Sequence, residues 1–243
     1  MQLCVLGCGD AFASGGRFQT CFHVAAAETR FLIDCGSSAL IAMRKFAIDP
    51  NGVETVFLTH LHGDHFGGLP FLILDAQTVS RRTAPLTLVG PPGLRERLRD
   101  LMEVLYPGSS TLELGFALDV VALTPETPTT INGVQVTAFP VRHPSGAPSF
   151  ALRLGCDGKA LCTTGDTEWT DTLIPAANGV DLLIAEASSA EQVIPYHLNW
   201  ETLQRRLPEM GAKSVLLTHM GPDMLEHAAG GCQKAADGAR IQV

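Results

Sequence analysis

Short apolar runs alternate with glycine, proline and polar residues along the whole chain, which is the pattern of buried strands separated by turns. In the first third, such runs predict strands over residues 3–6, 21–26, 30–33 and 54–59. Longer segments with helical spacing predict helices over residues 37–46, 67–80 and 93–105, the last with Pro91-Pro92 at its beginning.

The middle of the chain is rich in predicted strands, over residues 86–89, 116–123, 134–139, 149–154 and 160–163. The last third alternates strands over 181–184 and 214–217 with helices over 200–207 and around Met224. Two strand-rich halves, each with helices, favour a layered α/β sandwich in which helices lie outside two packed sheets. No break in composition divides the 243 residues, so we expect a single domain over residues 1–243.

A cluster of metal-binding residue types follows the apolar run Val56-Phe57-Leu58, in the heptapeptide Thr59-His60-Leu61-His62-Gly63-Asp64-His65. Two histidines two residues apart on extended backbone point to the same side and can bind one cation. Gly63 lets the chain turn, so that Asp64 and His65 can present an oxygen and a nitrogen to a second cation. The alternative is a polar loop that caps a helix. Three histidines and one aspartate in this order favour a dinuclear hydrolytic centre.

Three further ligand types occur just past predicted strands. His143 follows the apolar run 134–141, Asp166 follows Leu161-Cys162-Thr163-Thr164-Gly165, and His219 follows Val215-Leu216-Leu217-Thr218. Strand ends deliver side chains into clefts at the edge of a sheet. We therefore expect these three residues to complete the metal site.

Charge and composition narrow the substrate and the location. The formal net charge is −8, and Lys and Arg are dispersed, which argues against an extended nucleic-acid surface and favours a small anionic substrate near the cations. The chain starts directly as a strand, and nowhere do about 18 apolar residues run together, which argues against a signal peptide and against a membrane span. Seven scattered cysteines are typical of a reducing compartment, so we expect a cytoplasmic protein.

The order of these motifs resembles the metallo-β-lactamase superfamily over nearly the whole chain. The matching elements are Asp34 in Phe31-Leu32-Ile33-Asp34-Cys35-Gly36, the His60 to His65 motif, His143, Asp166 in Thr164-Gly165-Asp166-Thr167, and His219. The resemblance implies a four-layer αββα sandwich with the site at one edge. It also implies that His60, His62 and His143 hold one metal, that Asp64, His65 and His219 hold the other, and that Asp166 bridges them. Asp34 is similar to the carboxylate that orients a ligand imidazole.

Within the superfamily the chain is most similar to the ribonuclease Z-like phosphodiesterase branch. The similarity lies in Glu186, in Leu183-Ile184-Ala185-Glu186-Ala187-Ser188, and in His197, in Tyr196-His197-Leu198-Asn199. In that branch a histidine held by a carboxylate protonates the departing alkoxide. Members that process tRNA carry a long arm between the elements matching His143 and Asp166, but only 22 residues separate them here. This spacing disfavours a tRNA 3′-end endonuclease and leaves the small-molecule phosphodiesterases of the branch, including those that act on cyclic phosphates.

The resemblance implies a mechanism with two divalent cations. These cations, zinc by the imidazole-rich ligand set or else manganese, activate a bridging hydroxide. Asp64 accepts the water proton, and His197, backed by Glu186, protonates the leaving oxygen. Hydrolysis of a carboxylic ester, thioester or lactone and a non-catalytic metal-binding partner protein are the alternatives. A homodimer is compatible with the branch, and Arg17 in the glycine-rich loop over residues 9–20 is either a contact to the substrate phosphate or part of a plain turn.

Overall fold

Two seven-stranded sheets form the centre of the protein in a computed structural model that describes residues 1–243. The first sheet has the order β14 (Arg240–Gln242), β1 (Gln2–Gly7), β2 (Cys21–Ala25), β3 (Arg30–Ile33), β4 (Thr55–Phe57), β5 (Leu86–Gly90) and β6 (Leu118–Ala122). The second sheet has the order β13 (Gln233–Lys234), β12 (Val215–Thr218), β11 (Leu182–Glu186), β10 (Lys159–Thr163), β9 (Ser149–Cys156), β8 (Val134–Val141) and β7 (Thr129–Ile131).

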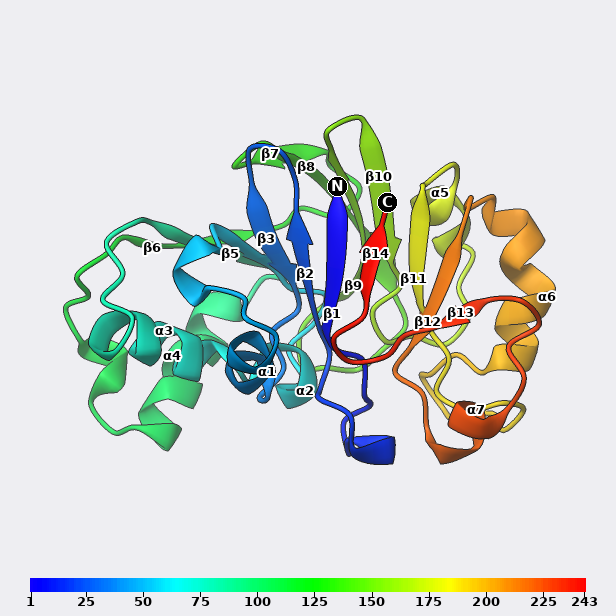
Figure 1. Cartoon of the computed structure of the whole chain (residues 1–243), viewed down its shortest axis with the longest axis horizontal. Helices are drawn as coiled ribbons and strands as arrows, with labels where there is room; N and C mark the ends of the chain where they lie inside the picture. The colour runs from blue at the N-terminus through cyan, green and yellow to red at the C-terminus, as the bar shows by residue number, and fades with distance from the viewer.

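Helices cover the outer faces of both sheets (Figure 1). The first sheet carries α1 (Ala39–Lys45), α2 (Gly63–Phe66), α3 (Leu69–Thr78) and α4 (Leu94–Leu105), and the second carries α5 (Leu173–Ala177), α6 (Trp200–Met210) and α7 (Pro222–Glu226). Three short 3₁₀ turns are η1 (Ser14–Gly16), η2 (Pro50–Gly52) and η3 (Ser109–Thr111). This arrangement confirms the four-layer αββα sandwich predicted from the sequence. None of the helices is long and apolar enough to cross a membrane.

Burial on both faces explains why the strands read as continuous apolar runs. In β1, Leu3 and Val5 pack between the two sheets, whereas Cys4 and Leu6 pack toward the helices. A separate cluster joins the outer face of the second sheet to α5 and α6, with Leu203 and Trp200 among its members. Three apolar layers therefore hold four layers of secondary structure together.

The structure differs from the sequence prediction at the strand that precedes the histidine motif. Strand β4 ends at Phe57 rather than at Thr59, because the Asp34 carboxylate, not a neighbouring strand, accepts the N–H of Thr59 at 2.8 Å. His60 and His62 therefore lie in a loop, and α2 begins at Gly63. The short elements β7, α5, β13 and β14 were not predicted, because two to five residues give too little periodicity to recognise.

The strand directions bring the ligand-bearing loops to one edge of the sandwich. Strands β3, β4 and β5 run parallel to one another, as do β10, β11 and β12, so each set ends at one edge of its sheet. The segment between His143 and Asp166 is the antiparallel hairpin of β9 and β10, with Cys156 opposite Lys159. The 22 residues between His143 and Asp166 are therefore occupied largely by this hairpin.

Candidate metal centre

Three histidines form the first group of candidate ligands. His60 and His62 follow β4, His143 follows β8, and their ring nitrogens all lie within 4.8 Å of one another. The His143 Nε2 lies 2.9 Å from the His62 Nδ1. The Nδ1 of His143 faces the backbone carbonyl of Tyr196 at 3.0 Å, a bond that fixes the ring and directs its Nε2 toward the other two histidines.

Asp64, His65, Asp166 and His219 form the second group, again with ligand atoms within 4.8 Å of one another and all four side chains buried. The Asp64 Oδ2 lies 3.2 Å from His65 Nε2 and 3.2 Å from His219 Nε2. Asp64 and His65 come from the single turn of α2, and His219 follows β12 of the other sheet. The group therefore spans the edge between the two sheets.

The Asp166 carboxylate lies between the two groups. Its Oδ2 is 3.8 Å from His60 Nε2, 3.9 Å from His143 Nε2 and 3.2 Å from His219 Nε2, and its Oδ1 is 3.3 Å from His65 Nε2. One carboxylate thus faces nitrogens of both groups, which is the geometry of a ligand shared by two cations a few ångströms apart.

Unsatisfied nitrogens show that a divalent cation fits this cluster. The Nε2 atoms of His60 and His65 are fully buried and have no hydrogen-bond partner. Buried polar atoms are otherwise almost always hydrogen-bonded. The other nitrogens of the same two rings are engaged, at 3.0 Å from Thr59 Oγ1 and at 2.8 Å from Asp34 Oδ2. Rings that are fixed through Nδ1 and leave Nε2 unpaired are arranged as metal ligands.

Burial and nearby carboxylates shift the pKa values of the clustered histidines in opposite directions. Burial lowers the pKa of His60 well below its ordinary value, which keeps that ring neutral. Burial opposes protonation of His219 as well, but Asp166 and the hydrogen bond with Asp64 raise the pKa of His219 to about 9. Without a cation, His219 therefore holds a proton at neutral pH, and a metal bound there would take the place of that proton.

Asp34 fixes the position of the His65 ring through its Nδ1. Its buried carboxylate accepts hydrogen bonds from the Thr59 N–H at 2.8 Å and from Thr59 Oγ1 at 2.9 Å, in addition to its contact with His65 Nδ1. Asp34 adopts a left-handed backbone conformation, with φ of 57°, as does His219, with φ of 55°. Left-handed backbone at two non-glycine positions beside His65 is typical of functional geometry.

A carboxylate and an imidazole lie directly beside the second group. Glu186, at the end of β11, is fully buried; its Oε1 is hydrogen-bonded to His197 Nδ1, and its Oε2 accepts the Thr167 N–H at 2.8 Å. The His197 ring stacks on that of His219 at 5.8 Å. Burial lowers the pKa of His197, but the hydrogen bond and the charge of Glu186 outweigh burial and raise it overall. With Nδ1 held by Glu186, the Nε2 of His197 is the nitrogen available to a substrate.

The cluster opens into a pocket of about 440 Å³. His62, His143, His197 and His219 line it together with Asp64 and Asp166, and the remaining walls come from the loops before η1, after β11 and at the start of α7. Aspartates line the pocket, and no Glu, Lys or Arg side chain does.

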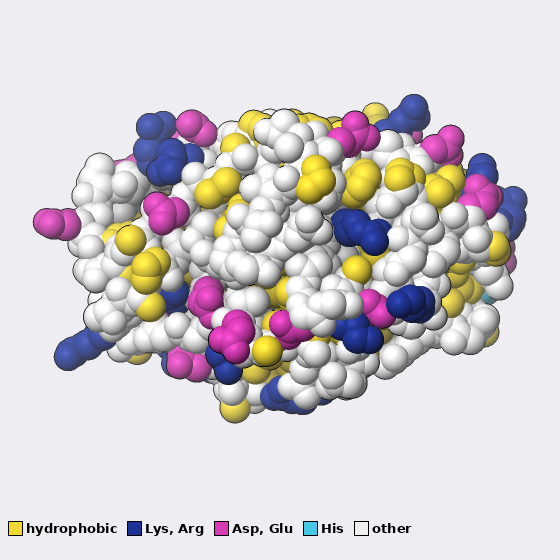
Figure 2. Space-filling view, turned by 90° about the horizontal axis from the view of Figure 1, so that it is seen from above, with side chains coloured by type: hydrophobic (Ala, Val, Ile, Leu, Met, Phe, Trp, Pro, Cys, Tyr) yellow, Lys and Arg dark blue, Asp and Glu magenta, His cyan; other side chains and the backbone are white.

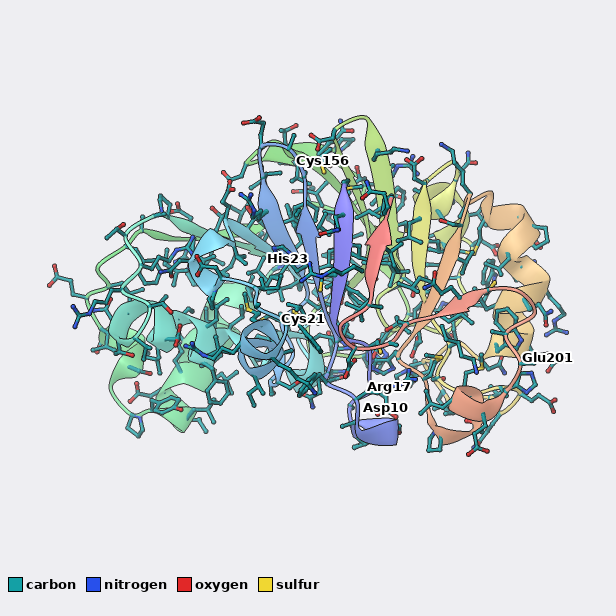
Figure 3. All side chains as sticks on the ribbon, in the orientation of Figure 1. Asp10, Arg17, Cys21, His23, Cys156 and Glu201 are labelled. Atoms are coloured by element: carbon teal, nitrogen blue, oxygen red, sulfur yellow. The ribbon has the colours of Figure 1, made fainter.

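Every residue predicted to act in the site is therefore brought to this one edge, but one suggested contact is not made. The guanidinium of Arg17 points away from the pocket and donates to the Ala235 carbonyl at 3.0 Å and toward Cys8 Sγ at 3.7 Å. Asp10 and Arg17 lie below the carboxyl end of β1, on the loop that contains η1 (Figure 3). Sequence reasoning missed Thr59 as the partner of Asp34, although its place at the head of the histidine motif was a usable signal.

Comparisons with known proteins agree with this geometry. A family model described as Anti-Pycsar protein Apyc1 matches residues 1–238. Ribonuclease Z of Lachnoclostridium phytofermentans is 33% identical over 144 residues, which are 59% of this chain and 45% of that protein, so the match spans less than half of the relative. The crystal structure of human tRNase Z, short form, superimposes with a TM-score of 0.80 at 26% identity and covers 100% of this chain and 99% of that chain.

A second solved structure supports the fold alone. The metallo-β-lactamase fold protein YhfI from Bacillus subtilis superimposes with a TM-score of 0.80 at 22% identity, covering 99% of this chain and 98% of that chain. The resemblance inferred from the motifs is confirmed. The chain belongs to the Anti-Pycsar protein Apyc1 family, in the ribonuclease Z-like branch of the metallo-β-lactamase superfamily.

Proposed function

We propose that this protein is a metal-dependent hydrolase, and specifically a phosphodiesterase that acts on small or nucleotide-like phosphodiesters, cyclic ones included. The observation that carries the proposal is the pair of Glu186 and His197 beside the histidine and aspartate cluster. An alkoxide is a poor leaving group, so diester cleavage benefits from a positioned proton donor. A half-buried imidazole held by a buried carboxylate at the pocket wall supplies one.

Two divalent cations are proposed for the cluster. His60, His62 and His143 would hold one, Asp64, His65 and His219 the other, and Asp166 would contact both. Bound there, the cations would lower the pKa of a water molecule and neutralise charge on the phosphoryl oxygens. Imidazole-rich donors favour zinc, and the carboxylates also admit manganese.

The side chains around the cluster have separate tasks in proton transfer. Burial tends to protonate Asp64, but His65 and His219 keep its pKa below the ordinary range, so the carboxylate is ionised and able to accept a proton from the attacking water. His197, beside His219, donates its proton to the leaving oxygen. Glu186 keeps the His197 ring oriented and stabilises its protonated form.

Two observations favour a small substrate over a structured RNA. The span between His143 and Asp166 is filled by the hairpin of β9 and β10, which leaves no additional arm. No Lys or Arg side chain lines the pocket, and on the opposite face of the molecule, shown in Figure 2, Lys and Arg lie among Asp and Glu without gathering into a stripe. A face that tracks a nucleic-acid backbone needs such a stripe.

A homodimer is proposed as the assembly. Exposed apolar side chains occur on α1, at the end of α3 and on α4, namely Ile41, Val79 and Val104. Exposed apolar surface of this kind is available for contacts between protein chains. Sedimentation should show twice the mass of one chain, and Val104→Glu should shift the protein toward the monomer.

A substrate panel tests the proposed activity. Metal-loaded and chelated protein are assayed on bis(p-nitrophenyl) phosphate, a nucleoside 3′,5′-cyclic phosphate, a tRNA precursor, a carboxylic ester, a thioester and a lactone. We expect metal-dependent cleavage of the phosphodiesters. Faster cleavage of an ester, thioester or lactone would assign the site to that chemistry, and full metal loading without turnover on any substrate would indicate a binding protein.

A variant of His197 tests the catalytic role of the Glu186–His197 pair. His197→Ala should lower turnover by a factor of about 10² to 10⁴. Metal content should stay unchanged, because His197 is engaged by Glu186 and belongs to neither of the two ligand groups described above, although its ligand atoms also lie near those of Asp166 and His219. His227→Ala, at the end of α7 and away from the cluster, is the matched control and should retain activity. Loss of metal in His197→Ala would instead make His197 a structural residue.

A further inference from the structure

One aromatic side chain stands almost fully in solvent at the mouth of the candidate site. Phe12 is 91% exposed and lines the pocket, as do Asp10 and Ala11 of the same loop and Ile194 of the segment after β11. Phe12 is the most exposed large apolar side chain of the protein. Water contact over most of a phenyl ring forgoes about 2 kcal/mol of burial energy, so its position at the pocket calls for an explanation.

The loop that carries Phe12 is tied down at many points. Within the loop, Asp10 accepts hydrogen bonds from the N–H groups of Phe12 at 3.1 Å and Ser14 at 2.8 Å. At both ends of the loop, the Asp237 carboxylate accepts the N–H of Cys8 at 3.1 Å and that of Phe18 at 2.7 Å. The ring is therefore presented at the rim by a braced loop and not by a loose terminus.

Arg17 contributes to this bracing. Its guanidinium donates to the carbonyl of Ala235, two residues before Asp237. The loop, on which Figure 3 labels Asp10 and Arg17, is therefore held to the carboxyl-terminal segment by the Arg17 guanidinium and by the Asp237 carboxylate. A Cβ on Gly15 would lie 2.8 Å from Leu225 of α7, so the loop also packs closely on the wall of the pocket. The bracing holds Asp10, Ala11 and Phe12 at the rim.

The charges of the pocket indicate what Phe12 can meet. Apart from the candidate metal ligands and His197, the pocket lining contains two charged side chains, Asp10 and Asp223, and both are acidic. A second phosphate of a substrate would be repelled there, whereas an uncharged planar ring would lose nothing electrostatically. Phe12 and Ile194, from two different loops of the lining, offer that ring apolar contacts.

We propose that Phe12 is a specificity residue that contacts the planar, uncharged part of the substrate, a ring of the nucleobase type, while the phosphodiester lies at the histidine cluster. This inference rests on the proposed phosphodiesterase function. Stacking of a base on an aromatic side chain is tolerant of base identity, because each base has a π face. Phe12 therefore selects for the presence of a ring rather than for one base.

The test compares two substrates that differ only in the ring. One is a nucleoside 3′,5′-cyclic phosphate, and the other is its 1′-deoxy analogue, which keeps the cyclic phosphate and lacks the base. Phe12→Ala should raise KM for the first by about tenfold, within the range of about 5 to 150 that loss of a base-stacking aromatic produces. Its kcat, and both constants for the base-free analogue, should change by less than about twofold.

Two further variants sharpen the comparison. Phe12→Trp keeps an aromatic face and should restore the KM of the base-bearing substrate. Leu112→Ala removes a different exposed apolar side chain outside the pocket and should change neither substrate. Because Phe12 is exposed, the melting temperature of Phe12→Ala should equal that of the wild type.

The possible outcomes separate the inference from the function on which it rests. If wild-type protein cleaves both substrates and Phe12→Ala affects both equally or neither, the role of Phe12 is refuted and the phosphodiesterase function stands. If metal-loaded wild-type protein cleaves neither diester, the proposed function fails and the inference fails with it.

Discussion

Replacing Asp34 by asparagine should weaken metal binding without disturbing the fold. The side chain is 1% exposed, asparagine has nearly the same shape, and asparagine tolerates the left-handed backbone conformation of this position. The Thr59 N–H, 2.8 Å from Oδ1, requires an oxygen on that side. The amide NH₂ of the variant must then face Nδ1 of His65, where the wild type has Oδ2 at 2.8 Å.

This exchange reverses the tautomer of His65. In the wild type the carboxylate accepts the Nδ1 proton, so Nε2 carries a lone pair directed at the cluster. An NH₂ group favours an unprotonated Nδ1, which moves the proton to Nε2 and blocks it as a metal ligand. Loss of one such supporting partner typically lowers metal affinity by a factor of about 10 to 100. That factor is about 1.4 to 2.7 kcal/mol, close to the value of one hydrogen bond to a charged group.

Competition with a chromophoric chelator at pH 7.5 measures the effect, with zinc and the purified protein. The control is Asp49→Asn, whose side chain accepts the Asn51 N–H at 2.9 Å at the start of η2. Asparagine caps such a turn as well as aspartate does, so the control should bind zinc like the wild type. Unchanged affinity in Asp34→Asn would refute the tautomer argument. A lower free energy of unfolding in chelator, with affinity retained, would make Asp34 a purely structural residue.

Three other perturbations test the scaffold. A Cβ on Gly36 would lie 2.4 Å from the carbonyl oxygen of Asp64, so Gly36→Ala should lower zinc affinity, while Gly52→Ala, whose nearest neighbour is 3.9 Å away, should not. Arg82 is 4% exposed and donates to five backbone carbonyls. Arg82→Met should therefore lower the free energy of unfolding, measured in urea, by at least about 3 kcal/mol. Burial and two nearby arginines lower the pKa of His23 to about 4. The unfolded chain therefore takes up this proton first as the pH falls, and stability present above about pH 6.5 is lost progressively toward pH 4, by about 2 kcal/mol at pH 5. His23→Gln should remove that part of the loss, and an unchanged pH profile would refute it.

The residue types and the spacing of the apolar runs were sufficient to predict much of the fold and of the candidate site. Apolar runs buried on both faces predicted the strands, and the carboxylates and imidazoles just past them predicted the cluster, because parallel strands deliver their ends to one edge. The order of ligands from His60 to His219 also indicated which side chains would share a neighbourhood. Local chemistry and topology were enough for these features.

Contacts between distant segments could not be predicted in the same way. The Arg17 guanidinium points toward its acceptor, the carbonyl of Ala235, which is 218 residues away in the sequence. A substrate phosphate in the pocket would be an equally reasonable partner for a guanidinium, so the sequence alone does not distinguish the two. An Arg-Arg pair just past a helix, such as Arg81-Arg82, is typical of a solvated helix end. Arg82 is instead buried against the turn around η2 and donates to backbone carbonyls rather than to a carboxylate. A guanidinium can satisfy its donors in either setting, so only the fold distinguishes them.

The metal centre and the sandwich depend on each other through buried charge. The first sheet supplies Asp34 and Asp64, and the second supplies Asp166 and Glu186, so four buried carboxylates meet where the edges of the two sheets approach. Burial and the charge of Asp166 raise the pKa of Glu186, whereas His65 and His219 hold the pKa of Asp64 below its ordinary range. Without a cation, protonated imidazoles therefore balance part of the negative charge, and divalent cations bound to the cluster would take over that task. The same ions would join residues from both sheets, so metal binding should stabilise the sandwich as well as activate a substrate.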